Sequence, residues 1–360
     1  MNCLHIRSKQ KTVLLFRIGQ LGDTLVSLPA IDAIKKRHGE YRLILLTDRQ
    51  KGNNRIVSSW DVLGPLNIFD EVVYYEHTSN VIGTIKNMFR LIFRLKSLGI
   101  QKAYNLAPER RDKQKFRDNV FFKYLLGITN YLDDKAVSWP PRNKSGKTSY
   151  VDPEWFRLLR VTGGDVQHNQ YRLDVPQSFR EEAERSFKAL GIRCDGNVIA
   201  IGPGSKMPAK RWPRENYADL GAMLLDRYPD ISLAVLGGKE DAGIGNELCA
   251  GWGTRAFNLA GKLSIYGSAA ALERCAMYVG NDTGTMHLAA MVGKPCVAIF
   301  SSRDYQGKWE PYGDGHIIMR TDPACAGCML EVCTRNMECL TAISPEDVMK
   351  QIDLMLRKKE

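Results

Sequence analysis

The hydrophobic positions of this chain fall into short apolar runs that alternate with amphipathic stretches. In the first half, the run at 12–17 is typical of a buried strand, and the stretch 24–38 carries apolar residues at helical spacing. A second strand-like run at 42–47 completes a strand–helix–strand unit, which predicts parallel strands with the helix packed on the sheet. Further strands are expected at 71–75 and 102–106, with a helix at 81–98 between them.

The same alternation starts again near residue 178. The expected helices are 178–190, 214–228, a stretch ending at 250 and 345–358, and the expected strands are 197–202, 231–236, 275–279 and 294–300. We therefore predict two α/β domains, 1–175 and 176–344, joined near 165–180. The last helix, 345–358, has apolar residues that could pack back on the first domain.

Composition is that of an ordinary globular protein: 360 residues, of which 44% are hydrophobic and 25% charged. No uncharged apolar run reaches the ~18 residues of a membrane-spanning helix, and the first residues lack the apolar stretch of a signal peptide. These features predict a cytoplasmic protein.

The formal net charge of +11 favours acidic partners. No helix-turn-helix, zinc-finger or aromatic RNA-binding motif accompanies the charge, which argues against nucleic acid. The helix expected at 81–98 is basic and amphipathic, so it suits a peripheral contact with a membrane, although packing on the sheet is the favoured interpretation. Much of the excess charge gathers at Arg110, Arg111, Lys113, Lys115, Arg117, Lys123, Lys135, Arg142, Lys144 and Lys147.

The polar turn that follows the strand at 275–279 is the strongest candidate site. Asp282 and Thr283 can cap the next helix, Gly284 lets a ligand approach the backbone, and the free N–H groups of the first turn suit a phosphate. His287 lies four residues after Thr283 and so faces the same ligand. A simple helix cap with a core histidine is the alternative, but the convergence of these groups favours a binding site.

In the first domain, the turn from Gly19 to Asp23 also joins a strand to a helix. It lacks the glycine spacing of a dinucleotide fold. Asp23 either caps the helix or, if the two domains face each other across a cleft, acts as a general base toward a ligand held by the second domain.

Two more turns end strands of the second domain. After the strand at 197–202, Ser205 and Lys210 offer a hydroxyl and an ammonium group, which suit a diphosphate. After the strand at 231–236, Glu240 could accept hydrogen bonds from ribose hydroxyls at the sheet edge where nucleotides bind.

These turns belong to longer motifs, which occur in one order over most of the chain. The motifs are Phe16 to Leu25 with Leu28-Pro29-Ala30, Pro203-Gly204-Ser205 with Lys210-Arg211-Trp212-Pro213, and Asn281-Asp282-Thr283-Gly284 with His287-Leu288-Ala289-Ala290. In this combination the chain resembles glycosyltransferase family 9, the ADP-heptose:lipopolysaccharide heptosyltransferase family.

The resemblance implies a GT-B fold of two Rossmann-like domains facing across a cleft, with the ADP-sugar donor on the second domain and the acceptor on the first. Asp23 falls on the base that deprotonates the acceptor hydroxyl for inverting attack, and Lys210 on the lysine that binds donor phosphate. Glu240 is placed less securely, and Leu263 is expected to touch the adenine region through its backbone. The remaining donor contacts are Ser205, Asp282, Thr283, Gly284 and His287.

The activity implied by the resemblance is transfer of heptose, or a related sugar, to an acidic glycolipid of the lipopolysaccharide core. No metal cofactor is required for this chemistry, because a helix dipole and a lysine can neutralise the leaving ADP. One alternative is the same fold with another nucleotide-sugar, serving an O-antigen, a capsule or a protein. Another is a non-catalytic nucleotide-sugar-binding protein, against which the presence of Asp23 argues. The oligomeric state is not predicted.

Nine cysteines in a cytoplasmic chain are expected to be mostly reduced. Four of them gather in one segment, Cys325-x-x-Cys328-x4-Cys333-x5-Cys339. Their spacing suits either a structural zinc or iron site or a cluster of thiols without a metal. In neither case is the segment expected to be catalytic. The other five are Cys3, Cys194, Cys249, Cys275 and Cys296.

Overall fold

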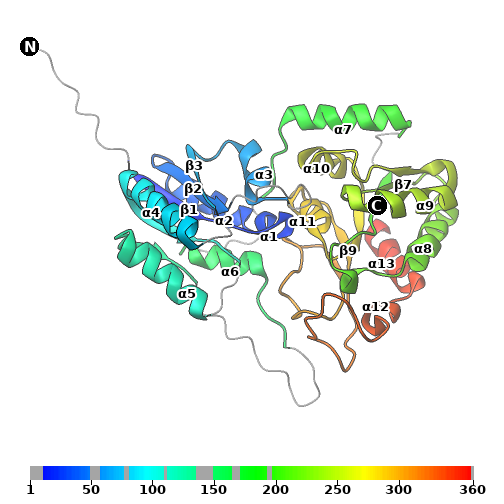
Figure 1. The fold of residues 1–360 in the computed structure, drawn as a ribbon. Coiled ribbons are helices and arrows are strands. Elements are labelled where there is room, and N and C mark those ends of the chain that lie inside the picture. The colour runs from blue at the N-terminus through cyan, green and yellow to red at the C-terminus, as the bar shows by residue number, and fades with distance from the viewer. Residues whose placement is uncertain are drawn as a thin grey trace, which may run out of the picture. The chain divides into compact units, whose positions relative to one another are not determined.

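The computed structural model describes residues 11–48, 57–76, 81–108, 112–134, 149–163, 171–192 and 197–357. Their contacts divide the chain into two compact units, whose elements are labelled in Figure 1. The first unit holds the described residues up to 134 together with 155–163, and the second holds 149–154 and everything described from 171 onward. The expected boundary at 175/176 therefore differs from this division.

Residues 149–154 precede the expected boundary but belong to the second unit. The Val151 N–H donates to the Gln306 carbonyl at 2.9 Å, and the Glu154 N–H donates to the Lys308 carbonyl at 2.8 Å. These backbone bonds tie the segment to the loop after β10 (Cys296–Ile299).

The first unit contains a five-stranded parallel sheet in the order β3-β2-β1-β4-β5. Its strand order reverses at β1, because β2 lies on one side of β1 and β4 on the other. Such a switch point opens a crevice at the carboxyl ends of the strands, where ligands of α/β proteins bind. The strands are β1 Thr12–Phe16, β2 Arg42–Asp48, β3 Glu71–Tyr75, β4 Ile100–Asn105 and β5 Asn130–Leu132.

The helix expected at 24–38 is two helices, α1 (Leu21–Leu25) and α2 (Leu28–Arg37). Pro29 explains the break, because it has no N–H to donate to the carbonyl of residue 25 in a continuous helix. The other helices of this unit are α3 Ser59–Leu63, α4 Val81–Ser97, α5 Asp112–Asn119, a π-helix at Val120–Leu125 and α6 Glu154–Val161.

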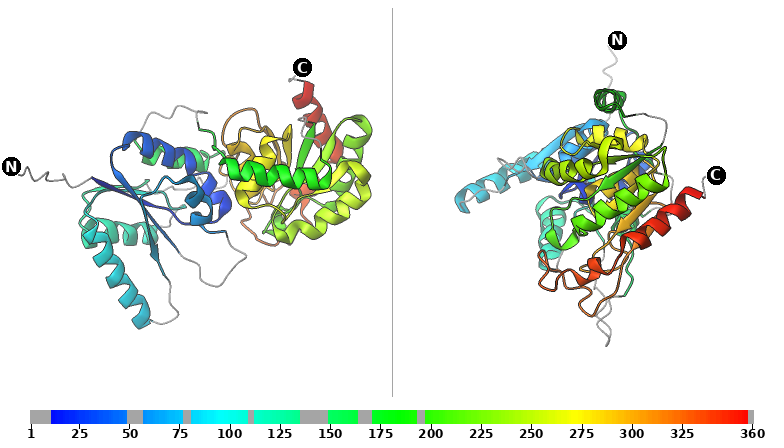
Figure 2. Two further views of the ribbon diagram at one scale, coloured as in Figure 1. Left: turned by 90° about the horizontal axis from the view of Figure 1, so that it is seen from above. Right: turned by 90° about the vertical axis from the view of Figure 1, so that its right-hand side faces the viewer.

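Helices α4 and α5 cover one face of this sheet and α2 covers the other, as Figure 2 shows. This follows from the strand order, because right-handed crossovers that run in opposite directions from β1 place their helices on opposite faces. Leu95 of α4 and Phe122 of the π-helix belong to one buried cluster with Phe16 of β1. The α4 and α5 segments are therefore neighbours on the same side of the sheet.

The second unit contains a six-stranded parallel sheet in the order β11-β10-β9-β6-β7-β8. Its switch point lies between β6 and β9. The strands are β6 Val198–Gly202, β7 Ser232–Val235, β8 Ala256–Asn258, β9 Met277–Asn281, β10 and β11 Ile317–Met319. The helices are α7 Gln177–Leu190, α8 Arg214–Arg227, α9 Ala242–Trp252, α10 Ile265–Glu273, α11 Gly284–Met291, α12 Glu338–Thr341 and α13 Pro345–Arg357.

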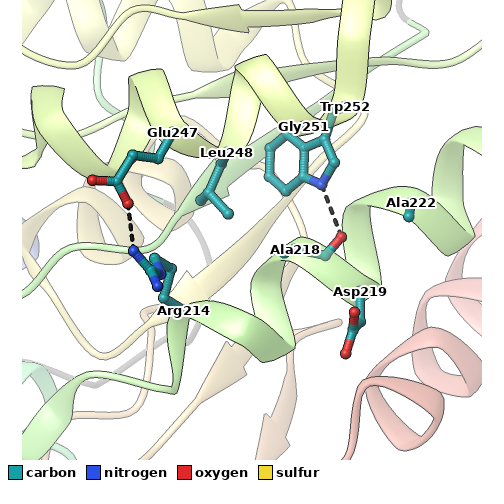
Figure 3. Close-up of a pocket in the computed structure, with 8 residues that line it drawn as sticks. All are labelled: Arg214, Ala218, Asp219, Ala222, Glu247, Leu248, Gly251 and Trp252. Atoms are coloured by element: carbon teal, nitrogen blue, oxygen red, sulfur yellow. Dashed lines mark hydrogen bonds and ion pairs between the residues drawn. The ribbon is translucent and has the colours of Figure 1, made fainter.

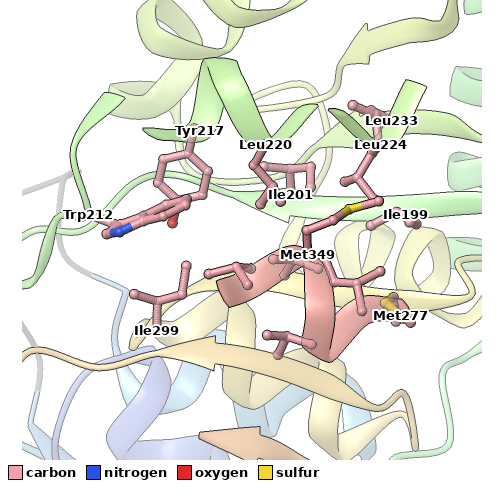
Figure 4. Close-up of a cluster of buried hydrophobic side chains, with 14 of the residues drawn as sticks. Ile199, Ile201, Trp212, Tyr217, Leu220, Leu224, Leu233, Met277, Ile299 and Met349 are labelled. Carbon is pink, nitrogen blue, oxygen red and sulfur yellow. The ribbon is translucent and has the colours of Figure 1, made fainter. Parts of the chain in front are cut away.

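The C-terminal helix α13 packs on α8 within the second unit, whereas the sequence analysis considered packing on the first domain. Its Met349 lies with Leu220 and Leu224 of α8 and with Ile199 of β6 in one buried apolar cluster, shown in Figure 4. At the surface, the Tyr228 hydroxyl donates to Asp353 at 2.6 Å, which fixes the end of α8 against α13. The apolar face that suggested a reach to the first domain is thus used locally.

Candidate functional site

The switch point of the second sheet brings the turns after β6 and β9 side by side. Gly202 of β6 and Gly280 of β9 are direct partners in the parallel register. A Cβ on Gly202 would lie 1.9 Å from the Tyr278 hydroxyl, and a Cβ on Gly280 would lie 2.4 Å from the Gly202 carbonyl oxygen. Only glycine fits at both positions, so the two strand ends approach closely and their turns form one site.

Asn281 joins these turns to the start of α8. Its Nδ2 donates to the Pro203 carbonyl at 2.7 Å. Its Oδ1 accepts from the Trp212 N–H at 3.0 Å and from the Tyr217 hydroxyl at 2.8 Å. The side chain is fully buried. Asn281 therefore holds together the end of β9, the turn after β6 and the start of α8. We did not predict this function of Asn281 from the sequence.

Lys210 and Asp282, both predicted to contact the donor, form an ion pair. Lys210 Nζ lies 2.5 Å from Asp282 Oδ2, and both side chains are largely shielded from solvent. Lys210 ends a short 3-10 helix, Pro208–Lys210, whose position follows from the neighbouring Arg211, which donates from Nε to the Ser205 carbonyl at 2.7 Å. A lysine and a carboxylate thus stand together at the carboxyl edge of the sheet.

The start of α11 is where the sequence predicts phosphate-binding backbone groups. Thr283 is the N-cap residue of this helix in an extended conformation, and Gly284 is its first helical residue. Both residues are partly exposed, and the N–H groups of a first helical turn have no partner within the helix. Burial raises the pKa of Tyr278, which lies beneath this turn, far above its usual value. Its hydroxyl therefore stays neutral beside any bound anion.

His287 lies one helical turn after Thr283, as its spacing predicted, and its N–H donates to the Thr283 carbonyl at 3.2 Å. The side chain is only 2% exposed. Its ring meets the ring of Trp309 edge-on, with centroids 6.4 Å apart. Trp309 in turn donates from Nε1 to Asp304 at 3.0 Å. The loop after β10 thus packs behind His287, which the sequence did not predict.

Ser205 is buried in the turn after β6, where its Oγ accepts from the Met207 N–H at 3.3 Å. Its hydroxyl holds the turn that carries Lys210. Glu240 and Leu263 lie farther along the same edge, in the turns after β7 and β8, and these turns are joined by the Gly261 N–H, which donates to the Gly237 carbonyl at 3.1 Å.

Asp241, and not Glu240, points toward the turn after β6. Glu240 is exposed, whereas Asp241 is partly buried and accepts from the Gly238 N–H at 2.9 Å. A Cβ on Gly204 would lie 2.0 Å from Asp241 Oδ1. Burial raises the pKa of Asp241 above its usual value. The assignment of Glu240 to ribose hydroxyls stays a prediction, and Asp241 is a second carboxylate of this turn that the sequence analysis did not single out.

In the first unit, Asp23 lies at the carboxyl end of β1, next to the switch point. Its Oδ2 accepts from the Gln20 N–H at 2.9 Å, so it caps α1. Fully buried Arg17 donates to the carbonyls of Asp23 and Leu106 and fixes this turn between β1 and β4. Gly19 has φ +131°, and a Cβ there would lie 2.7 Å from Asp23 Cβ. Capping and a chemical function remain compatible, because the carboxylate is partly exposed.

The cysteine segment lies in the second unit. Each of its four thiols is free and partly buried. Burial raises the pKa of Cys339, and the charges of Cys325, Cys333 and Cys328 raise it further. Among the described residues, however, no group of three or more His, Cys, Asp or Glu side chains is arranged as a metal-binding set. The metal site therefore stays a prediction. Cys3 and Cys194 lie outside the described residues.

A pocket lies between α8 and α9, away from the strand ends that carry the predicted site residues, and is shown in Figure 3. It is bounded by the ion pair of Arg214 and Glu247, whose atoms are 2.6 Å apart, and by Trp252, which donates from Nε1 to the Ala218 carbonyl at 2.9 Å. None of the predicted site residues is among those that line it. We therefore assign the site to the strand ends and not to this depression. In the described part of the chain, no helix is both long and apolar enough to cross a membrane.

Comparison with known proteins identifies the family. Residues 148–337 match the model of glycosyltransferase family 9 (heptosyltransferase), which is more than half of the chain. Lipopolysaccharide heptosyltransferase 2 of Escherichia coli (strain K12) is 32% identical over 190 residues, covering 50% of this chain and 51% of that protein. Lipopolysaccharide heptosyltransferase 3 of Escherichia coli is 24% identical over 358 residues, which cover 93% of this chain and 96% of that protein. The chain spans about half the length of the first of these relatives.

Solved structures show the same fold. The family 9 glycosyltransferase of Veillonella parvula DSM 2008 superimposes with a TM-score of 0.70 at 19% identity, covering 99% of this chain and 100% of that one. ADP-heptose lps heptosyltransferase II of E. coli gives a TM-score of 0.65 at 18% identity, and the match covers 97% of this chain and 99% of that one. These likenesses confirm the GT-B class of two α/β units with parallel sheets, and together with the family match they show that this chain belongs to glycosyltransferase family 9, the heptosyltransferase family.

Proposed function

We propose that this protein transfers heptose from ADP-heptose to a hydroxyl of a lipopolysaccharide core-type acceptor, with inversion at the anomeric carbon. The observation that carries the proposal is the pair of Lys210 and Asp282 beside the free N–H groups of α11, at the switch point of a family 9 sheet. Related structures are described as E. coli heptosyltransferase WaaC with ADP and with ADP-2-deoxy-2-fluoro heptose.

In the proposed donor complex, Lys210 and the backbone at Thr283 and Gly284 bind the diphosphate, because an ammonium group and a helix N-terminus both favour negative charge. Asp282 accepts from hydroxyls of the sugar, and His287 supports the same helix turn from its buried position. Ser205 holds the Lys210 turn. Glu240 is assigned to the ribose and the backbone at Leu263 to the adenine.

The proposed reaction is a single displacement. Asp23 takes the proton of the acceptor hydroxyl, and the oxygen forms a bond to the anomeric carbon as the bond from that carbon to the phosphate oxygen breaks. ADP leaves with the electron pair of the broken bond. Lys210 and the α11 terminus stabilise the charge that develops on the diphosphate, so the reaction needs no metal ion.

Calorimetry with ADP, UDP and GDP tests the donor class. We expect ADP to bind at least tenfold more tightly than UDP or GDP, since the resemblance assigns an adenine site at Leu263. A preference for UDP or GDP would favour the same fold with another nucleotide-sugar. ADP binding without ADP release in the presence of ADP-heptose and a Kdo-bearing lipid acceptor would favour a binding protein.

A further inference from the structure

Helix α4 of the first unit has two apolar faces. Leu91, Leu95 and Leu98 pack into or against the buried cluster under the sheet, so the helix is anchored as a crossover helix must be. A second apolar stripe points outward. In it Phe93 is 79% exposed, Phe89 69% and Ile85 51%, and Met88 is also exposed. The packing on the sheet that we favoured from the sequence is therefore confirmed for one face of α4, and a second face is exposed.

The exposed residues form one continuous stripe. Ile85, Phe89 and Phe93 are spaced by four residues, and Met88 lies next to them in the preceding turn, so they share a face. Large aromatic side chains are costly to leave in water, and a contiguous exposed patch marks an interaction site. Burying the two phenylalanine side chains against a partner would stabilise the complex through the hydrophobic effect.

Positive charge borders this stripe. Lys86, Arg90 and Lys96 of α4 are all exposed. On a helix, Lys86 and Arg90 fall on the flank next to Phe89 and Phe93, between the apolar stripe and the packed face. Arg94 continues the flank, and its guanidinium lies 2.6 Å from Glu71. Aromatic residues on one face with basic residues beside them are typical of helices that lie in the interface of an anionic membrane.

The neighbouring α5 and π-helix repeat the pattern on the same side of the sheet. Phe116 and Tyr124 are exposed, as is Leu125 at the end of the π-helix. Lys113 and Lys123 are exposed on the same segment. Figure 2 shows α4 and α5 on the side of this sheet opposite to α2. We name this side, formed by α4, α5 and the π-helix, the aromatic–basic face.

We propose that the aromatic–basic face docks on the surface of a bilayer that contains anionic phospholipids, with Phe89 and Phe93 inserted among the acyl chains and Lys86 and Arg90 at the phosphate groups. The positive charge of this face favours a membrane over a protein as its partner. The apolar stripe alone would suit another protein equally well, but the flanking cations match the negative surface potential of a membrane. The chain carries +11 overall, which adds a long-range attraction of the same sign. The inference goes beyond the proposed transfer and does not depend on it.

Vesicle sedimentation tests the proposal with the full chain and without any substrate. We expect binding to vesicles of phosphatidylcholine mixed with phosphatidylglycerol, little binding to phosphatidylcholine alone, and weaker binding at high salt, because exposed charges are screened. The double variant Phe89→Ser/Phe93→Ser should lose at least about tenfold in vesicle affinity. The double variant Lys86→Glu/Arg90→Glu should lose about fivefold or more per residue.

Two matched controls lie in the second unit. Arg185→Glu/Lys188→Glu makes the same charge change at exposed positions of α7, and Leu354→Ser removes an exposed apolar residue of α13. Both should bind vesicles like the unchanged protein. All variants alter exposed side chains, and equal thermal unfolding midpoints would show that they fold.

Three results would overturn the proposal. One is the absence of binding to anionic vesicles, and another is an equal loss in the controls, which would indicate a general charge effect. The third is a dimer in sedimentation velocity that Phe89→Ser/Phe93→Ser dissociates, since the face would then join two copies of the chain. None of these results bears on ADP release, so they leave the transfer proposal standing.

Discussion

Lys210 and Asp282 pair with each other across 72 positions of sequence, with Nζ and Oδ2 2.5 Å apart. Removing either partner leaves the other as a shielded charge without its counterion, which is strongly unfavourable. In the donor complex that we propose, a diphosphate that approaches Lys210 meets an ammonium group already oriented by a carboxylate, so donor binding and the pairing would be linked.

The first prediction concerns Lys210→Ala. We expect ADP to bind about tenfold to a hundredfold more weakly, because a charge-assisted contact is worth about 1.5–3 kcal/mol. Adenosine, which lacks the diphosphate, should bind almost as before. Calorimetry with both ligands measures the difference. Lys206→Ala, an exposed lysine in the same turn, is the control and should leave both affinities unchanged. Equal losses for ADP and adenosine would mean that Lys210 only supports the turn.

The second prediction separates the two functions of Asp23. Asp23→Asn should lower transfer about 10²–10⁴-fold while ADP affinity persists, because the amide keeps an acceptor for the Gln20 N–H but cannot take a proton. Asp61→Asn is the matched control, since Asp61 accepts from the Ser58 N–H at 2.8 Å in the same type of cap at α3. Steady-state ADP release checks both. Near-normal turnover in Asp23→Asn would remove it from the mechanism and leave only the cap.

The third prediction is that Asn281→Ala destabilises the second unit by about 2–4 kcal/mol. The alanine leaves the Pro203 carbonyl and the Trp212 N–H without a partner in a fully buried place, and it leaves the Tyr217 hydroxyl with only its 3.3 Å contact to the Gly202 carbonyl. Denaturant unfolding measures the loss. Asn216→Ala, a partly buried asparagine of α8 with one long contact of 3.4 Å to Ile343, should lose much less. A similar loss for both would contradict the importance that we assign to Asn281.

The fourth prediction concerns the cysteine segment. If the segment binds a metal, its four thiols must come together around one zinc or iron ion, since their spacing suits tetrahedral ligation. Elemental analysis of protein purified without chelator should find about one metal ion per chain. Cys328→Ser should lower metal content and thermal stability, whereas Cys249→Ser, a free thiol of α9, should not. Metal-free protein would establish the segment as thiols only.

Long amphipathic helices and buried central strands could be predicted from the sequence, because their apolar periodicity is dictated by the core they face. The edge strands β5, β8 and β11, each of three residues, were missed because so short a run carries no period. Pro29 indicates the break between α1 and α2, but the apolar periodicity over 24–38 predicted one continuous helix. The sequence indicated a basic, amphipathic α4 suited to a membrane contact, but it did not predict two apolar faces, since periodicity shows that a helix has an apolar face and not whether it has two.

The predicted site residues on α11 and in the Lys210 turn meet at one edge, because strand order places β6 beside β9. Sequence spacing could suggest that edge but not the order of the strands. Asn281 escaped prediction for a related reason. Its partners are separated from it by 64 to 78 positions, so only the folded register reveals them.

The facing glycines Gly202 and Gly280 have a consequence for how this family diversifies. Gly202 is required by the Tyr278 hydroxyl, and Gly280 by the same hydroxyl and by the Gly202 backbone. A relative could change its sugar or its acceptor and still have to keep both. Invariance at these two positions among homologues would therefore reveal shared architecture, whereas substrate preference would have to be sought in the side chains of the turns that follow them.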